Sequence, residues 1–349
     1  MTTPPSPAPR PTTADTQRMA QLLAGFQQSQ ALHAFAELGV ATALLDGPLP
    51  LGELADVTAT DPDALLRLLR FLSGIDVVSY EPDGVFALTA LGATLADGPG
   101  SVRALAAFWM QTHYIPFSDL PTTIRTGEPA FEAHFGRTFG DWLGDHPRYL
   151  DSLFGAMSEV ARWIKVDLLT GYELPPGRVV ADIGGSDGTL LAGLIASDAE
   201  RRGIVLDVPG AVPAAAKRLT ELGVADRVKA VGGDFFTEVP SADVYLLSTV
   251  LHDWNDDQCA TILANIARAA HPGARLVVLE AVLPDTDAPH PAKFNDLAML
   301  GVGAGRERSH AEYAELLATA GFTPTRHLPG PSYNPFSLLE ARLEDRVED

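Results

Sequence analysis

A glycine turn that follows a short apolar strand is the part of this chain best suited to binding a ligand. Residues 178–188 read Arg-Val-Val-Ala-Asp-Ile-Gly-Gly-Ser-Asp-Gly, and a helical pattern begins at Thr189. Glycines let the backbone come close to a ligand, and the start of the next helix offers unpaired N–H groups. The next predicted strand ends in Asp207, roughly 20 residues on, where a carboxylate can bind ribose hydroxyls. The pattern predicts a site for a nucleotide-like ligand.

The spacing of the glycines argues against the commonest nucleotide-binding motifs. A dinucleotide fingerprint, G-x-G-x-x-G, has glycines at its first, third and sixth positions, whereas Gly184, Gly185 and Gly188 occupy the first, second and fifth. The ATP- and GTP-binding pattern G-x-x-x-x-G-K-[ST] is absent from the sequence. Taken alone, the turn could be a tight connection and nothing more, so other segments must decide.

Polar side chains recur at or just after the predicted strand ends in the second half of the chain. Asp234 follows one strand, His252 follows another within Leu-His-Asp-Trp, and Glu280 ends the strand 275–280. In an open parallel sheet, ligands bind at the carboxyl ends of the strands. We therefore expect these residues, together with Asp207, to surround one binding site.

The order of these segments resembles the S-adenosylmethionine-dependent O-methyltransferases that act on plant phenolics and bacterial aromatic natural products. The resemblance covers nearly the whole chain, and its most specific parts are residues 251–254 and the Gly-Arg-Glu-Arg-Ser run at 305–309. It implies that His252 is the general base, flanked by Glu280 and Glu307, and that the methyl donor leaves as S-adenosylhomocysteine. The donor contacts that it implies are Asp182, Gly184, Gly185, Gly188, Asp207, Val208, Gly233, Asp234, Phe235, Ser248 and Trp254.

Three serines depart from the family's pattern. Ser186 stands where a third glycine is common, Ser309 stands where threonine is usual, and Ser248 replaces a lysine that plant members have near the donor. These changes affect contacts with the donor more than the chemistry of transfer.

The proposed catalytic residues also have purely structural interpretations. The His-Asp pair at 252–253 could cap the following helix. Glu280 could be a solvated strand end, and Glu307, which stands between two arginines, could form a surface ion pair. Trp254 could stack on adenine or simply pack against its neighbours.

Methyl transfer from a sulfonium to oxygen is an in-line displacement, so the protein must align the reactants and remove the acceptor's proton. A phenol has a pKa of about 10, against about 6.5 for free histidine. That gap of roughly 3.5 units corresponds to about 5 kcal/mol of uphill proton transfer. Two carboxylates near His252 would stabilise its imidazolium form, narrow the gap and fix the tautomer.

The candidates for the acceptor pocket come from three stretches of the chain, and any of them could equally be ordinary core. They are Trp109, Met110, His113, Phe154, Met157, Asn295, Asp296, Met299 and Leu300. The nine histidines form no recognisable metal motif, and the single cysteine, Cys259, cannot make a cysteine-based zinc site. We expect metal-independent transfer to a hydroxyl, phenolic in type, of a small aromatic or polyketide-like metabolite.

The predicted fold class is α/β, a Rossmann-like doubly wound methyltransferase domain preceded by a mostly helical winged-helix domain. The resemblance assigns that first domain to homodimer formation, and Pro175-Pro176-Gly177 marks the start of the second. The expected parts are a disordered tail at 1–14, the dimerisation domain at 15–100, a helical linker and pocket region at 101–176, the donor-binding catalytic domain at 177–343 and a tail at 344–349.

The net charge of −20, from 25 Lys and Arg against 45 Asp and Glu, repels nucleic acid. A non-catalytic winged-helix regulator is therefore the weaker alternative, since its recognition helix would carry only Arg67 and Arg70. A second alternative is a relative that binds the same donor but hydroxylates or decarboxylates an aromatic polyketide. The sequence has no apolar stretch of about 18 residues and no signal-peptide pattern, so we expect no membrane span and a cytoplasmic protein.

Overall fold

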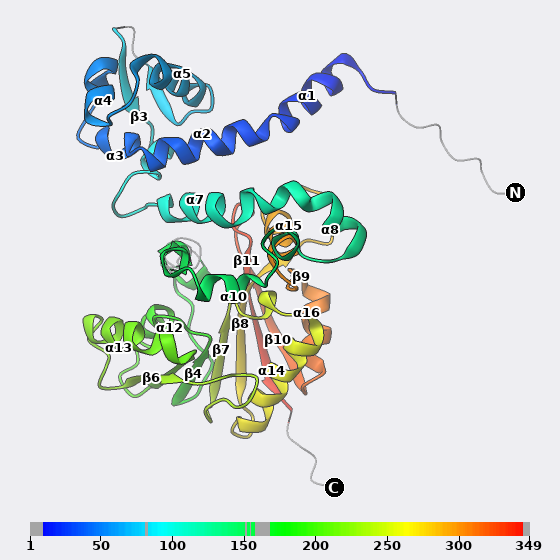
Figure 1. Cartoon of the computed structure of the whole chain (residues 1–349). Coiled ribbons are helices and arrows are strands. Elements are labelled where there is room, and N and C mark those ends of the chain that lie inside the picture. Colours follow the sequence, from blue (N-terminus) through cyan, green and yellow to red (C-terminus); the bar gives the residue numbers. More distant parts are fainter. Residues whose placement is uncertain (1–9, 81–82, 151, 154, 158–167, 345–349) are drawn as a thin grey trace, which may run out of the picture. The chain divides into compact units, whose positions relative to one another are not determined.

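The computed structural model describes residues 10–80, 83–150, 152–153, 155–157 and 168–344. The chain divides into two compact units (Figure 1), each with a hydrophobic core of its own. The first unit lies within Met1–Gln111 and Arg148–Glu159, and the second within Thr112–Pro147 and Val160–Asp349.

The first helix of the first unit, α1, begins at Thr13 and ends at Leu23. Its start is fixed by a capping box, in which Thr12 accepts from the backbone of Asp15 and the Asp15 carboxylate accepts from the backbone of Thr12. The helix therefore begins inside the segment 1–14 that we expected to be a disordered tail, and that expectation is wrong for its last residues.

The rest of the first unit is helical with a small antiparallel sheet. Its core contains Phe35, Leu54 and Phe86, all fully buried. The sequence of residues 76–88, in which Pro-Asp-Gly stands between two apolar runs, predicts a hairpin. Strand β2 is paired antiparallel to β3, with Val78 opposite Leu88. The elements are α2 (Gly25–Glu37), α3 (Val40–Ala43), β1 (Leu49–Pro50), α4 (Leu51–Val57), α5 (Pro62–Ser73), β2 (Val78–Tyr80), β3 (Val85–Leu88), α6 (Ala90–Ala93) and α7 (Arg103–Trp109).

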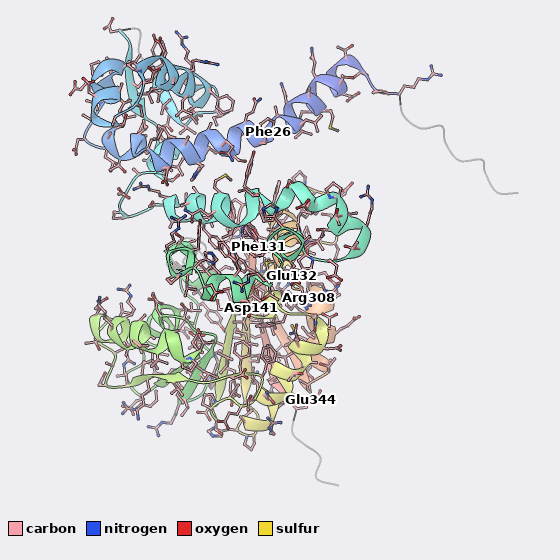
Figure 2. The ribbon with its side chains drawn as sticks, in the orientation of Figure 1. Phe26, Phe131, Glu132, Asp141, Arg308 and Glu344 are labelled. Carbon is pink, nitrogen blue, oxygen red and sulfur yellow. The ribbon has the colours of Figure 1, made fainter. Side chains whose placement is uncertain are left out.

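Short helices precede the large sheet of the second unit. Phe131, labelled in Figure 2, is fully buried and makes edge contacts with Phe139 and Trp142. Left-handed glycines end two of the helices, at Gly127 and Gly136. The elements are η1 (Met110–Tyr114), η2 (Pro116–Asp119), α8 (Leu120–Thr126), α9 (Ala130–Phe135) and α10 (Phe139–Gly144).

The large sheet is built mainly of parallel strands joined by helices, which confirms the predicted Rossmann-like class. Its strands are β4 (Val179–Ile183), β5 (Arg202–Asp207), β6 (Val228–Gly232), β7 (Val244–Ser248), β8 (Arg275–Leu283), β9 (Arg308–Ser309), β10 (Phe322–Pro329) and β11 (Phe336–Leu343). The helices are α12 (Thr189–Leu194), η3 (Pro209–Ala211), α13 (Val212–Glu221), η4 (Leu251–Asp253), α14 (Asp256–Ala269), α15 (Ala292–Val302) and α16 (His310–Ala318).

The strand order β10-β11-β8-β7-β4-β5-β6 reverses direction at β4, with β5 on one side and β7 on the other. Ligands of open α/β sheets bind at such a switch point, beyond the carboxyl ends of the strands. The glycine turn follows β4, and the segment with His252 follows β7. The topology therefore brings the two predicted functional segments to the same edge of the sheet.

Glu280 does not end its strand, contrary to the prediction. β8 continues to Leu283 because it pairs with β11 at Ala281 and with β9 at Val282 and Leu283. Its parallel neighbour β7 stops earlier, at Ser248 opposite Leu279. Glu280 therefore lies one residue beyond the parallel pairing with β7.

In the described part of the chain, no helix combines the length and apolar character needed to cross a membrane.

Candidate active site

His252 lies in η4, a short turn that leaves strand β7 abruptly. Thr249 adopts a left-handed backbone conformation with φ of 55°, which turns the chain out of the strand. The N–H groups of Val250 and Leu251 then donate to one oxygen of Glu280, each at 2.8 Å. A fully buried carboxylate thus satisfies two backbone donors that the strand exit leaves unpaired.

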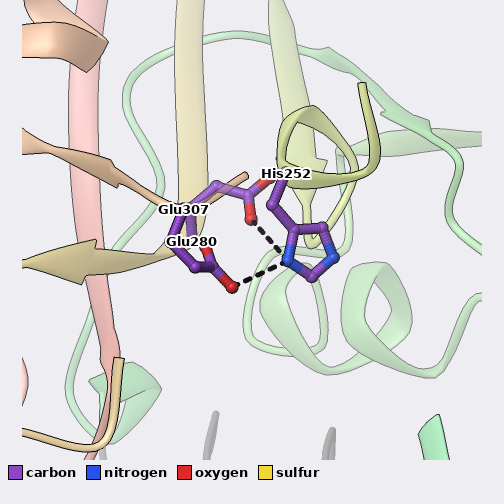
Figure 3. Close-up of side chains that lie close together, drawn as sticks. All are labelled: His252, Glu280 and Glu307. Atoms are coloured by element: carbon purple, nitrogen blue, oxygen red, sulfur yellow. Dashed lines mark hydrogen bonds and ion pairs between the residues drawn. The ribbon is translucent and has the colours of Figure 1, made fainter. Parts of the chain in front are cut away.

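Glu307 is the direct partner of the imidazole. Its Oε1 lies 3.0 Å from His252 Nδ1, and Glu280 Oε2 lies 4.0 Å from the same nitrogen. Figure 3 shows both carboxylates on one side of the ring, with the other ring nitrogen turned away from them. That second nitrogen, Nε2, lies 3.4 Å from the half-exposed carboxylate of Asp253. The geometry fixes Nδ1 on the buried carboxylates and leaves Nε2 on the side away from them.

The electrostatics of the cluster favour a charged imidazole. Burial alone lowers the pKa of His252, but the carboxylates of Asp253, Glu280 and Glu307 outweigh it and raise the pKa to about 10. Water screens the contribution of Asp253, because its side chain is 53% exposed. Burial also raises the pKa of Glu280 to about 7, although His252 opposes that shift. The two buried glutamates are thus the main reason that His252 is more basic than free histidine.

The structural interpretations of His252 and Glu307 do not fit this geometry. The cap of α14 is Asn255, whose side chain accepts from the backbone of Gln258 at 3.0 Å, so His252 caps no helix. Glu307 is 2% exposed and is therefore not part of a surface ion pair. Cys259 is buried, and its thiol donates to the carbonyl of Leu251. The catalytic roles themselves remain predictions.

Gly305 contacts the His252 turn and was not among the predicted site residues. A Cβ atom at this position would lie 2.0 Å from the carbonyl oxygen of His252 and 2.6 Å from the carbonyl carbon of Asp253. Only glycine fits such a close backbone approach. The signal was present in the sequence, since Gly305 opens the same run as Glu307, but spacing alone does not say which backbone it meets.

The glycine turn after β4 is packed so tightly that side chains are excluded from it. A Cβ at Gly184 would lie 2.8 Å from Val250, and one at Gly185 would lie 2.6 Å from the buried carboxyl of Asp182. Ser186 also has a left-handed backbone, with φ of 51°, which explains why glycine suits this position. The turn therefore has the conformation expected of a backbone cradle for a ligand.

Asp207 connects the glycine turn to the end of β5. One of its oxygens accepts from the N–H of Ser186 at 2.8 Å, and the other accepts from the N–H of Val208 at 2.7 Å. Val208 is 58% exposed, an apolar surface beside the carboxylate. A carboxylate next to an exposed apolar side chain suits a ribose and its base.

The remaining donor candidates lie around the same strand ends. Asp234 accepts from the backbone of Phe236 and so stabilises its own turn, and Gly233 faces Leu206 so closely that a Cβ would be 2.9 Å from it. The ring of Trp254 meets Phe235 and Phe236 edge-on, so it is packed on at least one side. The hydroxyl of Ser248 is buried without a hydrogen-bond partner among the described residues.

The acceptor-pocket candidates are divided between the two units. Trp109, Met110 and Met157 belong to the first unit, and His113 and the α15 residues Asn295, Asp296, Met299 and Leu300 belong to the second. Phe154 lies outside the described residues. Asp296 accepts from the N–H of Glu307 at 3.1 Å, so it borders the His252 cluster directly. Burial lowers the pKa of His113 to about 4, which keeps that ring neutral.

The cluster could in principle hold a metal ion. One ligand atom from each of His252, Glu280 and Glu307 lies within 4.8 Å of the others, and zinc accepts imidazole and carboxylate ligands. Here His252 Nδ1 is hydrogen-bonded to Glu307, and one oxygen of Glu280 accepts hydrogen bonds from two backbone N–H groups, so these atoms already have protein partners. Metal independence remains a prediction.

Comparison with known proteins gives two family matches, an O-methyltransferase domain over residues 117–323 and an O-methyltransferase dimerisation domain over residues 20–98. Phenazine O-methyltransferase PhzM of Lysobacter antibioticus is 38% identical over 327 residues, which cover 93% of this chain and 95% of that protein.

Two further relatives are named for different reactions, one for methyl transfer and the other for hydroxylation. NcsB1, an O-methyltransferase from neocarzinostatin biosynthesis, has been solved with S-adenosylmethionine and 2-hydroxy-5-methyl naphthoic acid. It is 32% identical with a TM-score of 0.74, and the match covers 90% of this chain and 95% of that one. Aclacinomycin 10-hydroxylase RdmB of Streptomyces purpurascens is 34% identical over 348 residues, which cover 95% of this chain and 91% of that protein.

Proposed function

This chain belongs to the family of S-adenosylmethionine-dependent O-methyltransferases, and we propose that its acceptor is a phenolic hydroxyl of a small aromatic or polyketide-like metabolite. We also propose that His252 is the general base and that transfer needs no metal. The observation that carries this is the imidazole held 3.0 Å from Glu307 with a second buried carboxylate beside it.

The residues of the donor site fit S-adenosylmethionine. The glycine turn has no Cβ atom at Gly184 or Gly185, so its backbone can approach the donor closely, and Asp207 at the end of β5 would accept from ribose hydroxyls. Bound there, the donor would supply a methyl group that its sulfonium charge has already activated. The protein itself must orient the acceptor oxygen and take up its proton.

The basicity of His252 matches the acceptor that we propose. A phenol has a pKa of about 10, and the carboxylates raise the pKa of His252 to about 10 as well. The carboxylates therefore reduce the uphill transfer of about 5 kcal/mol that free histidine would face. A nearby cationic donor would lower the pKa of His252 again, which favours the neutral form that can accept a proton.

Replacing His252 with alanine tests the assignment. We expect turnover to fall by on the order of 10²- to 10⁴-fold, while calorimetry still detects donor binding. The matched control is His271→Ala, which removes an exposed histidine paired with Asp243 at 2.7 Å and should leave turnover unchanged. Normal turnover in His252→Ala would overturn the role of His252 as the base.

Transfer can be distinguished from hydroxylation, the chemistry named for the relative RdmB. Mass spectrometry of an accepted aromatic substrate should show a gain of one methyl group and formation of S-adenosylhomocysteine in equal amounts. A gain of oxygen with the donor unconsumed would support the second candidate. The pairing of His252 with two buried carboxylates supports transfer, because that chemistry requires a base.

We propose further that the protein is a homodimer through its dimerisation domain. Apolar side chains are exposed on α1 and the start of α2, with Leu23 at 73% and Phe26 at 54%, which suits a surface covered by a partner copy. Light scattering should give the mass of two chains, and Leu23→Glu with Phe26→Glu should reduce it to one. Dimers that persist in this variant would place the interface elsewhere.

A further inference from the structure

Arg308 is a fully buried cation beside the His252 turn. It lies in β9, which pairs with the last residues of β8 (Figure 2). One terminal nitrogen donates to the carbonyl of Leu251 at 3.0 Å, and the other donates to the carbonyl of Trp254 at 2.9 Å. The guanidinium also forms a two-point contact with one oxygen of Asp256, at 3.0 and 2.7 Å.

These contacts enclose the turn that carries His252. Leu251 and Trp254 lie one residue before and two residues after it, so Arg308 fixes the backbone on both sides of the imidazole. Its backbone neighbour is Glu307, the direct partner of that imidazole. Arg308 also pairs with Val282 of β8, the strand that carries Glu280. Arg308 thus contacts the His252 turn through its side chain and β8 through its backbone, and it directly follows Glu307 in the chain.

A stabilising role alone does not explain why this cation is buried. Burying a charge is unfavourable unless every donor finds a partner. An exposed arginine could bind the same carboxylate without that desolvation cost. Arg306 contacts the other oxygen of the same Asp256 at 2.9 Å while its side chain remains 47% exposed. The planar fork of arginine can hold several acceptors at fixed angles, which is what positioning a turn requires.

We propose that Arg308 is a positioning residue that sets the distance between His252 and Glu307, and through it the basicity of His252. Its effect on catalysis rests on the proposed function, in which His252 is the base. Its effect on the imidazole does not, because the geometry of the turn exists without substrate.

The sign of the change in the pKa of His252 separates positioning from a simple effect of charge. Removing a nearby cation would by itself raise the pKa of the imidazole. If instead the turn loosens, His252 moves away from Glu307 and its pKa falls towards the value of free histidine, about 6.5. The two explanations therefore predict opposite shifts.

The experiment is an NMR titration of the His252 imidazole in the full chain, comparing the native protein with Arg308→Met and Arg308→Lys. We expect the pKa to fall by on the order of one unit or more in Arg308→Met. Arg308→Lys keeps the charge but loses the fork, so a smaller fall is expected there. The matched control, Arg306→Met, removes the exposed partner of the same carboxylate and should leave the pKa unchanged.

Kinetics then connect positioning to catalysis. Turnover in Arg308→Lys should fall by roughly 10²-fold, the cost of a small misplacement of a reacting group, with little change in KM. An unchanged or raised pKa in both Arg308 variants would overturn the proposal. If Arg308→Met does not fold, Arg308→Lys alone decides it. A lowered pKa in a protein that transfers no methyl group would leave positioning in place and defeat the proposed function instead.

Discussion

The two functional segments of the large sheet are built in different ways. The glycine turn after β4 is a backbone structure, made of consecutive residues whose small size is required by their close neighbours. The His252 turn after β7 is held by side chains from distant segments: Glu280 is 30 residues from its partner Val250, and Glu307 is 55 residues from its partner His252. The residues of the glycine turn are consecutive and can be recognised in the sequence, whereas the His252 site depends on long-range side-chain contacts that set both geometry and pKa.

The largest effect on turnover is expected at Gly305, where the backbone lies close to the His252 turn. In Gly305→Ala the new Cβ would lie 2.0 Å from the carbonyl oxygen of His252, so the turn must shift. Turnover should fall by on the order of 10²-fold or more in a kinetic assay. Gly303→Ala is the matched control, because a Cβ there meets nothing within 4 Å. Equal activity in the two variants would mean that the turn tolerates displacement.

A smaller effect is expected at the glycine turn. Asp207→Ala removes the carboxylate that binds the N–H groups of Ser186 and Val208, and a hydrogen bond to a charged group contributes about 1.5–3 kcal/mol. The dissociation constant for S-adenosylmethionine, measured by calorimetry, should rise roughly 10- to 100-fold. Asp226→Ala, at an exposed loop position, should bind as the native protein does. Unchanged affinity in Asp207→Ala would remove this residue from the donor site.

The smallest effect concerns stability. Ser186 has a φ of 51°, and a left-handed conformation costs a residue with a Cβ about 1–2 kcal/mol. Ser186→Gly should therefore raise the free energy of unfolding by about 1 kcal/mol in a denaturant titration. Ser197→Gly, at a position without positive φ, should lower it slightly instead. Destabilisation by Ser186→Gly would show that the serine side chain stabilises the turn.

Local features of the fold could be predicted from the sequence, and long-range features could not. The glycine turn, the start of α12 at Thr189 and the hairpin after α5 follow from consecutive residues. The length of β8 depends on β9 and β11, which pair with its last residues from far along the chain, so Glu280 was misplaced at the strand end.

The cluster of His252, Glu280 and Glu307 shows the same limit more clearly. The identities of His252, Glu280 and Glu307 came from a resemblance, and the structure brings the three side chains together. Their separate tasks could not be predicted, because one carboxylate binds backbone N–H groups and the other binds the imidazole. The burial of Arg308 was also missed, since a sequence of alternating charges at 306–308 favours a solvated surface.

The most direct measurement is the pH dependence of kcat/KM in the native protein and in Glu307→Gln. The control is Glu315→Gln, which changes an exposed position of α16. His252 accepts a proton only when neutral, so the rate should rise with pH until its pKa is passed. Because Glu307 helps to raise that pKa to about 10, Glu307→Gln should move the rise to lower pH and reduce the plateau. Ionisation of the acceptor is common to all three proteins and cancels in the comparison. Glu315→Gln should leave the pH profile unchanged. An equally unchanged profile in Glu307→Gln would contradict the role of His252 as a base whose pKa is set by its carboxylate neighbours.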